Sequence, residues 1–405
     1  MNDAKPQVIL ASNDIGAIRA AALTTGRGVA QLIDVDADGP DVVHLFPLAS
    51  SSVHPGAHSI VLDWHLDVDR PPRAASDSSA ARATAWVDTR GPTTVATCDL
   101  VFGAVCLESH PIEIVETGAG SFTRNLPVLE TTALESASVL CVGLGSSGSI
   151  VVDQLARAGV GQFVLWDMDR LESHNIGRHV CTLRDIGRRK VLAMRDHVLA
   201  VNPNAKVRCV DKSVLGAASA SQLEAAVAAA DCVVVGTDNN PSRFAVNDAA
   251  WRHGKPALFG RAFQRASGGD VIQVLPPAPP CYACQLRGRV VDEEISSKKD
   301  AARIPYSDVV VPVEPGLVID IHPIANMLAR LALLRLCEKR DGKLSAVAAE
   351  ARDPLYLWAN RREGQFARWR PMDRSYDRLA TYRWYGINVR RDEECTTCGD
   401  GADAS

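Results

Sequence analysis

Between residues 136 and 260, short apolar runs alternate with segments whose apolar residues have helical spacing. In the segment 146–158, for example, Ile150, Val151 and Leu155 recur at that spacing. Alternating strands and helices of this length predict a doubly wound, mostly parallel, Rossmann-like α/β sheet. The expected strands lie at 138–143, 162–167, 207–210, 231–236 and 256–260, and the expected helices at 146–158, 188–201, 219–229 and 242–253.

The flanking parts of the chain have weaker patterns. We expect a smaller N-terminal α/β domain over residues 1–125 and a second domain over residues 126–400. In the first domain we expect strands at 8–10, 42–46 and 59–62, a helix at 17–23 and a loop at 69–85. The second domain is expected to continue with a strand at 271–275, a polar crossover loop at about 286–316, an apolar helix at 317–337 and aromatic-rich strands within 355–391.

Charge and composition exclude some classes of protein. The 405 residues have a net charge of −4, so nucleic acid is an unlikely main partner. The first 130 residues are acidic and residues 335–391 are basic, which indicates either two solvated faces or a basic arm for an acidic partner. No uncharged apolar run has the roughly 18 residues of a membrane span, and the N-terminus does not resemble a signal peptide. We therefore expect a cytoplasmic protein without a membrane partner.

A glycine turn follows the first strand of the expected sheet. Gly143 permits a tight turn, Gly145 lets the backbone approach a phosphate, and Gly148 lets the next helix pack closely on the strand. Asp167 ends the second strand, where a carboxylate can hold ribose hydroxyls. This βαβ pattern predicts a nucleotide site, and by itself it fits a dinucleotide as well as ATP.

Four polar motifs then follow in a fixed order. They are the acidic loop 167–178 (DMDRLESHNIGR), the segment 186–190 (IGRRK), the pair 202–203 (NP) and the segment 237–243 (TDNNPSR). In this order they resemble the E1-like superfamily, which includes the ThiF-type and molybdopterin-pathway adenylyltransferases and the ubiquitin-activating enzymes. The resemblance covers about 138–340. It implies ATP- and Mg²⁺-dependent adenylation of the C-terminal glycine carboxylate of a ubiquitin-like or sulfur-carrier protein.

The residue types suit that chemistry. A carboxylate that attacks the α-phosphate of ATP releases pyrophosphate, so the site needs cations and a metal ion more than a general base. Arg178 and Lys190 would supply the cations, and Asn175 would bind phosphate oxygens. Asp167 would bind the ribose, with Asp169 a second candidate in the same loop.

Other candidates lie farther along the chain or before the first strand. Asp238 would hold magnesium, and its neighbour Asn239 is a further cofactor-binding candidate; Arg243 and His179 are equally well explained as structural residues. In relatives of this type an arginine upstream of the first strand reaches the neighbouring subunit's ATP site. Arg124 lies at about that position, which would make the protein a homodimer.

Two C-x-x-C pairs predict a structural zinc site. Cys281 and Cys284 form one pair, Cys395 and Cys398 the other, and together they offer four thiolates to one tetrahedral ion. The resemblance supports this, because many relatives have one pair before the crossover loop and one near the C-terminus. A redox dithiol is the alternative.

A catalytic cysteine is harder to place. Some E1-like enzymes have a nucleophilic cysteine in the crossover region, but residues 285–336 contain none. Cys181 is the remaining candidate, because the charges of nearby Arg178 and Lys190 would lower its pKa. The simplest hypothesis is that the acyl-adenylate passes to a separate thiol, amine or sulfur donor, such as an E2-like partner.

Three alternatives stay open at this point. The same pocket could adenylate a peptide or a tRNA, or the chain could be a non-catalytic scaffold derived from such an enzyme. A nicotinamide dehydrogenase is disfavoured, because no hydride-transfer residues stand out.

Overall fold

The chain folds into two units, Met1–Ser121 and Phe122–Ser405. The computed structural model describes residues 6–36, 39–47, 58–68, 81–103, 105–117, 122, 124–125, 127–129, 131–286, 316–338, 340, 343–363, 366 and 381–399. The crossover loop expected at about 286–316 lies almost entirely outside the described residues.

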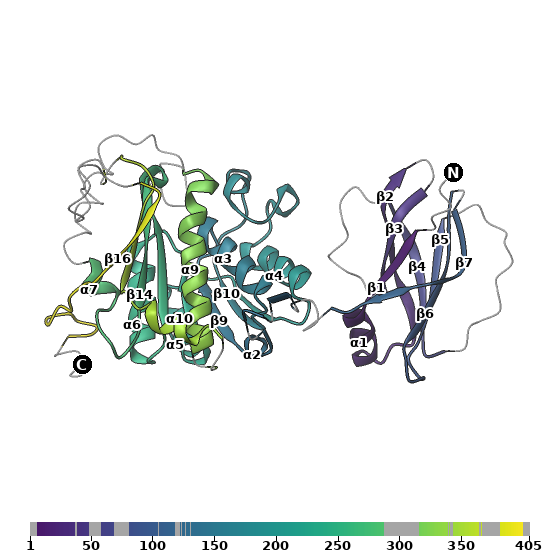
Figure 1. The fold of residues 1–405 in the computed structure, drawn as a ribbon, viewed down its shortest axis with the longest axis horizontal. Helices are drawn as coiled ribbons and strands as arrows, with labels where there is room; N and C mark the ends of the chain where they lie inside the picture. Colours follow the sequence, from purple (N-terminus) through teal and green to yellow (C-terminus); the bar gives the residue numbers. More distant parts are fainter. Residues whose placement is uncertain are drawn as a thin grey trace. The chain divides into compact units, whose positions relative to one another are not determined.

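The N-terminal unit is built on an eight-stranded sheet with strand order β7-β6-β5-β4-β2-β3-β1-β8 (Figure 1). β7 and β8 lie at opposite ends of this order although only Ile112 separates them in sequence, so the sheet curls back on itself as in a barrel. Its core contains Leu32, Leu62 and Trp64. The elements are β1 (Gln7–Ala11), α1 (Ser12–Ala20), β2 (Thr25–Asp36), β3 (Gly39–Phe46), β4 (His58–Leu66), β5 (Arg82–Asp88), β6 (Val95–Phe102), β7 (Val105–Pro111) and β8 (Glu113–Val115).

Sequence patterns found three of the eight strands of this unit. The three expected strands are confirmed as parts of β1, β3 and β4. The loop expected over 69–85 is wrong from Arg82 onward, where β5 begins. Ala83 and Ala85 are buried there, and alanine gives a weak strand signal because it is depleted in strands. The helix begins at Ser12 and ends at Ala20, earlier than expected.

The second unit confirms the expected α/β sheet. Its strand order is β11-β10-β9-β12-β13-β14-β15-β16, parallel from β11 to β13 and antiparallel beyond. The strand order reverses between β9 and β12, which is where open α/β sheets bind ligands. The strands are β9 (Ser138–Val142), β10 (Gln162–Trp166), β11 (Lys206–Val210), β12 (Cys232–Val235), β13 (Ala257–Ala262), β14 (Gly268–Val274), β15 (Leu355–Ala359) and β16 (Arg383–Ile387).

Helices cover both faces of this sheet, so β12 is buried at every position. Residues of α3, α4 and α9 share one core with Val139 and Cys141 of β9, whereas residues of α5, α6 and α7 share another with Leu140 and Val142 (Figure 1). No helix in the described ranges is long and apolar enough to cross a membrane. The helices are α2 (Thr131–Glu135), α3 (Ser146–Arg157), α4 (Lys190–Val201), α5 (Ala217–Ala229), α6 (Asn240–Arg252), α7 (Tyr282–Leu286), α9 (Val318–Glu338) and α10 (Ser345–Glu350), with 3-10 turns η2 (Ser173–Arg178), η3 (Leu183–Asp185) and η4 (Gln264–Ala266).

Candidate adenylation site and cysteine cluster

The glycine turn between β9 and α3 has the geometry of a phosphate cradle. Gly143 has φ +86°, and a Cβ there would lie 2.7 Å from the backbone nitrogen of Thr237. A Cβ on Gly148 would lie 1.9 Å from the Gly143 carbonyl oxygen, whereas a Cβ on Gly145 would meet nothing within 4 Å. Gly143 and Gly148 are therefore packed tightly against the backbone, whereas the space beside Gly145 is free. At Gly145 the first amides of α3 have no side-chain cap. This arrangement fits an anion such as an ATP phosphate.

Asp167 follows β10 and holds the glycine turn. Its carboxylate accepts the Leu144 N–H at 2.7 Å and the Asp169 N–H at 2.8 Å. Burial raises the pKa of Asp167. A carboxylate has about four acceptor positions, so these two bonds leave capacity for the ribose hydroxyls expected here.

Lys190 is the first residue of α4 and is almost completely buried. Its ammonium lies 2.8 Å from the Asp169 carboxylate, and its backbone N–H donates to the Asp169 carbonyl. Lys190, which we expected to bind phosphate, is thus paired with Asp169, which was the second candidate for binding the ribose. A buried cation needs such a partner, because an unpaired charge is costly to bury.

The turn η2 contains Asn175 and Arg178. Asn175 is buried, and its side-chain oxygen accepts the Glu172 N–H at 3.0 Å, which completes a capping box. Arg178 is half-buried at the end of the same turn. The structure therefore gives Asn175 a local structural contact in addition to the phosphate contact expected of it.

His179 connects η2 to the glycine turn, which makes it structurally more important than its sequence pattern indicated. Its Nδ1 accepts the Cys181 N–H at 3.0 Å, so Nε2 carries the proton and donates to the Leu144 carbonyl at 2.9 Å. Asp167 and His179 together hold both polar groups of the Leu144 backbone.

Acid should weaken the fold through His179. Burial lowers its pKa to about 4 from 6.5. Between these values the unfolded chain binds a proton that the folded chain does not, so the free energy of unfolding falls as pH decreases from 6.5 towards 4. We expect this fall to be smaller in His179→Gln than in the wild type. Thermal unfolding at pH 7.5 and pH 5 measures it, with a difference between the proteins of roughly 2–4 °C. Equal pH dependence in both proteins would contradict the assignment.

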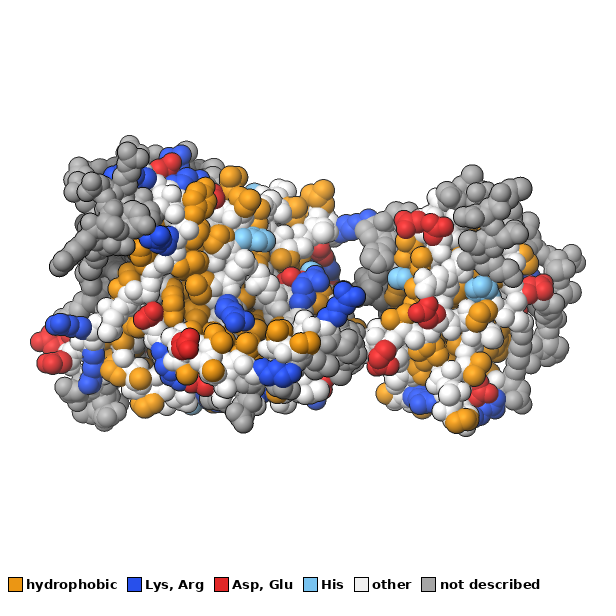
Figure 2. All heavy atoms as spheres, in the orientation of Figure 1, with side chains coloured by type: hydrophobic (Ala, Val, Ile, Leu, Met, Phe, Trp, Pro, Cys, Tyr) orange, Lys and Arg blue, Asp and Glu red, His pale blue; other side chains and the backbone are white. Residues whose placement is uncertain are grey.

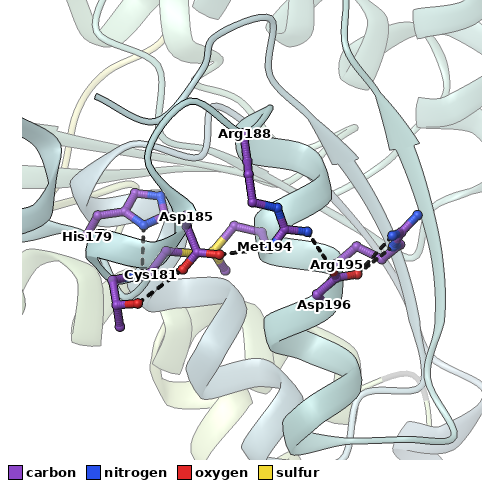
Figure 3. A network of polar contacts seen from close by, with 8 residues as sticks. His179, Cys181, Asp185, Arg188, Met194, Arg195 and Asp196 are labelled. Carbon is purple, nitrogen blue, oxygen red and sulfur yellow. Dashed lines mark hydrogen bonds and ion pairs between the residues drawn. The ribbon is translucent and has the colours of Figure 1, made fainter. Parts of the chain in front are cut away.

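The prediction that nearby basic residues lower the pKa of Cys181 is wrong. Burial raises the pKa of Cys181 to about 12, and its sulfur points towards Met194, with the two sulfurs 3.7 Å apart (Figure 3). The basic side chain whose charge acts on this thiol is Arg188, and it is held by Asp185 at 2.8 Å and also by Asp196. The positive charge that would stabilise a thiolate is therefore neutralised, and Cys181 belongs to the hydrophobic core.

The loop after β12 brings Asp238 to the carboxyl end of the sheet. Asp238 and Asn239 are exposed, and the side-chain oxygen of Asn239 caps α6 by accepting the Ser242 N–H at 3.0 Å. Arg243 is buried and donates to the Thr237 carbonyl oxygen, a hydrogen bond that fixes the backbone of this loop just before Asp238. This loop adjoins the glycine turn, because Gly143 contacts Thr237.

Arg124 is exposed and precedes α2 by a few residues. Its neighbour Asn125 donates to the Arg157 carbonyl at 3.3 Å, which anchors this stretch to the end of α3. The candidate for reaching a neighbouring subunit is therefore on the surface of the second unit.

The four cysteines of the two C-x-x-C pairs converge into one cluster. Their sulfurs all lie within 4.8 Å of one another, with Cys281 3.5 Å from Cys395 and Cys284 3.3 Å from Cys398. These distances exclude disulfides and are close to the ~3.8 Å between sulfurs that are each 2.3 Å from a tetrahedral zinc. Burial raises the pKa of Cys281 and Cys284, so a cation is required to hold them as thiolates. The cluster fits a zinc ion.

Tyr282 was missed in the sequence analysis. It lies inside the first C-x-x-C pair, is completely buried, and donates its hydroxyl to the Asn240 side chain at 3.0 Å. A tyrosine between two cysteines gives no sequence signal of a contact with a residue 42 positions away.

The second unit matches a known protein family. A model described as the ThiF family matches residues 122–361, more than half of the chain.

The basic segment 335–391 is only partly within this match. On the face shown in Figure 2, described basic and acidic side chains are interspersed over the second unit rather than gathered in one basic surface.

Individual relatives agree with this match. The chain is 37% identical over 157 residues to a sulfur carrier protein adenylyltransferase of Thermus thermophilus, covering 37% of this chain and 56% of the relative. It is 32% identical over 152 residues to the SAMP-activating enzyme E1 of Haloferax volcanii, covering 37% of this chain and 54% of the relative. The chain thus spans little more than half the length of these relatives. The crystal structure of E. coli MccB with selenomethionine MccA has the same fold, with a TM-score of 0.50, 18% identity and coverage of 70% of this chain and 75% of that one.

Proposed function

Because the chain belongs to the ThiF family, we propose that it is an adenylyltransferase that uses ATP to activate the C-terminal carboxylate of a small protein. The observation that carries this proposal is the junction of two loops at the switch point of the sheet. The glycine turn after β9, open at Gly145, adjoins the loop that carries Asp238 after β12. A nucleotide cradled by the first loop would have its phosphates beside the second.

The reaction follows from the charges around this junction. The substrate carboxylate attacks the α-phosphate of ATP, an acyl-adenylate forms, and pyrophosphate leaves. The N-terminus of α3, Arg178 and Lys190 would stabilise the charge on the phosphates, and Asp167 would bind the ribose. Asp169 would hold Lys190 in the absence of ATP and release it to the phosphates on binding.

Magnesium and zinc have separate places in the proposal. Asp238 is exposed at the carboxyl end of β12 and would hold a Mg²⁺ that neutralises phosphate charge. The four-cysteine cluster would hold a structural zinc that fastens the C-terminal segment to the sheet.

We propose a ubiquitin-like or sulfur-carrier protein with a C-terminal glycine as the substrate. Support comes from the relatives, one named for a sulfur carrier protein and one as an activating enzyme. The described cysteines of the second unit are buried, apart from half-buried Cys209, so we propose that the acyl group passes to a separate thiol, amine or sulfur donor. Arg124 would complete the ATP site of a second subunit in a homodimer.

Exchange of radioactive pyrophosphate into ATP tests the proposal. We expect exchange with a carrier protein ending in Gly-Gly and none with the same protein lacking those two residues. Exchange with a free peptide, or adenylation of a tRNA, would keep the enzyme class and replace the substrate. Absence of ATP binding would refute the proposal and leave a scaffold role.

A further inference from the structure

The helix α6 connects the cysteine cluster to the loop that carries Asp238. Both cysteine pairs have a neighbour that bonds to the middle of this helix: the Tyr282 N–H donates to the Asn247 side chain at 2.9 Å, and the Thr397 hydroxyl donates to Asp248 at 2.7 Å. The N-terminus of α6 is Asn240, two residues after Asp238. The cluster and the carboxylate are therefore attached to one rigid element.

The side chain of Tyr282 makes a second and more direct connection. It is completely buried between Phe259 and Phe244, with ring centroids 4.5 Å and 5.6 Å away. Its hydroxyl donates to the Asn240 side-chain oxygen at 3.0 Å.

Asn240 in turn belongs to a set of hydrogen bonds that shapes the loop. Its side-chain oxygen also accepts from Arg243 at 3.2 Å, and Arg243 donates to the Thr237 carbonyl on the other side of Asp238. Asn239 donates to the Asp238 carboxylate at 3.3 Å. The position of Asp238 thus depends on Asn240 and Arg243, and Tyr282 holds Asn240 by a hydrogen bond.

We propose that Tyr282 is a positioning residue that transmits the order of the four-cysteine cluster to Asp238 and so sets the affinity of the adenylation site for Mg²⁺. This inference rests on the proposed function, in which Asp238 holds that ion. Tyr282 does not contact the substrates; it acts through Asn240 and the loop that follows β12.

The variant Tyr282→Phe tests the proposal, because it removes the hydroxyl and keeps the ring that packs on Phe259. We expect the Mg²⁺ concentration for half-maximal pyrophosphate exchange to rise about three- to tenfold, the effect of one hydrogen bond. The rate at saturating Mg²⁺, the zinc content and the melting temperature should stay near those of the wild type. Tyr356→Phe, at a half-buried tyrosine of β15, is the matched control and should leave all four quantities unchanged.

A double-mutant cycle identifies the route. Asn240→Ala should raise the Mg²⁺ requirement as well, and adding Tyr282→Phe to it should have little further effect, because the two side chains form one bond. A wild-type Mg²⁺ requirement in Tyr282→Phe would overturn the inference, and so would a loss confined to zinc content and stability. If the wild type itself shows no Mg²⁺-dependent exchange, the proposed function fails instead.

Discussion

Replacing Asp238 with alanine should reduce pyrophosphate exchange by at least two orders of magnitude. The carboxylate is exposed at the carboxyl end of β12, beside the glycine turn and at the switch point of the sheet. Without it, Mg²⁺ would lack its protein ligand while negative charge develops on the phosphates, and losing one such stabilising group typically costs 10²–10³ in rate. Steady-state exchange over a range of ATP and Mg²⁺ concentrations measures the loss.

Two further variants make this test specific. Glu224→Gln removes a carboxylate from α5, where it pairs with Arg252 and His253, and should leave exchange intact. Asp238→Asn keeps the size and the hydrogen-bonding capacity of the side chain but not its charge, and should be nearly as inactive as the alanine variant. Full activity in Asp238→Ala would show that the magnesium site lies elsewhere.

Loss of the cluster metal should have the largest effect on stability. Cys281→Ser removes one of four sulfurs that lie 3.3–3.9 Å from their neighbours. Structural zinc sites contribute on the order of 10 kcal/mol of apparent binding free energy, so the melting temperature of the second unit should fall by more than about 10 °C. We also expect proteolysis after β16, because the cluster joins Cys395 and Cys398 to α7.

Metal analysis and limited proteolysis measure these effects. The wild type should contain one zinc per chain, and Cys281→Ser should contain little. Cys106→Ser, at an exposed cysteine of the N-terminal unit, should retain the metal and the melting temperature. A wild-type protein that contains no zinc, or a Cys281→Ser variant with unchanged stability, would contradict a structural metal.

Local patterns predicted the elements of the second unit well. The helix expected at 146–158 is α3, whose apolar residues have helical spacing. The strand expected at 231–236 contains β12, a continuous apolar run that is buried at every position. In the N-terminal unit the strands β2, β5, β6, β7 and β8 were not predicted. In β5 the reason is that a run with alanine at its buried positions has little apolar contrast. In the N-terminal sheet, Ile9 of β1 pairs with Glu113 of β8, a contact that no local pattern contains.

The candidate site divides in the same way. The glycine turn and Asp167 were predicted from the βαβ pattern alone, whereas Lys190 and Asp238 were assigned through the resemblance to the E1-like superfamily. For Cys181, proximity in sequence to basic residues was misleading, because the side chain turned inward to Met194 and burial raised its pKa. Short sequence separation says nothing about the direction in which a side chain points.

The sequence alone determined the sheet type, the glycine turn and the two C-x-x-C pairs, because each depends on residues close together in the chain. The tertiary structure decided which distant groups meet: Cys284 with Cys398, 114 residues apart, and Tyr282 with Asn240. It also decided that His179 is neutral and joins η2 to the glycine turn. Burial and long-range hydrogen bonding arise only when strands and helices pack, so they could not be predicted from local pattern.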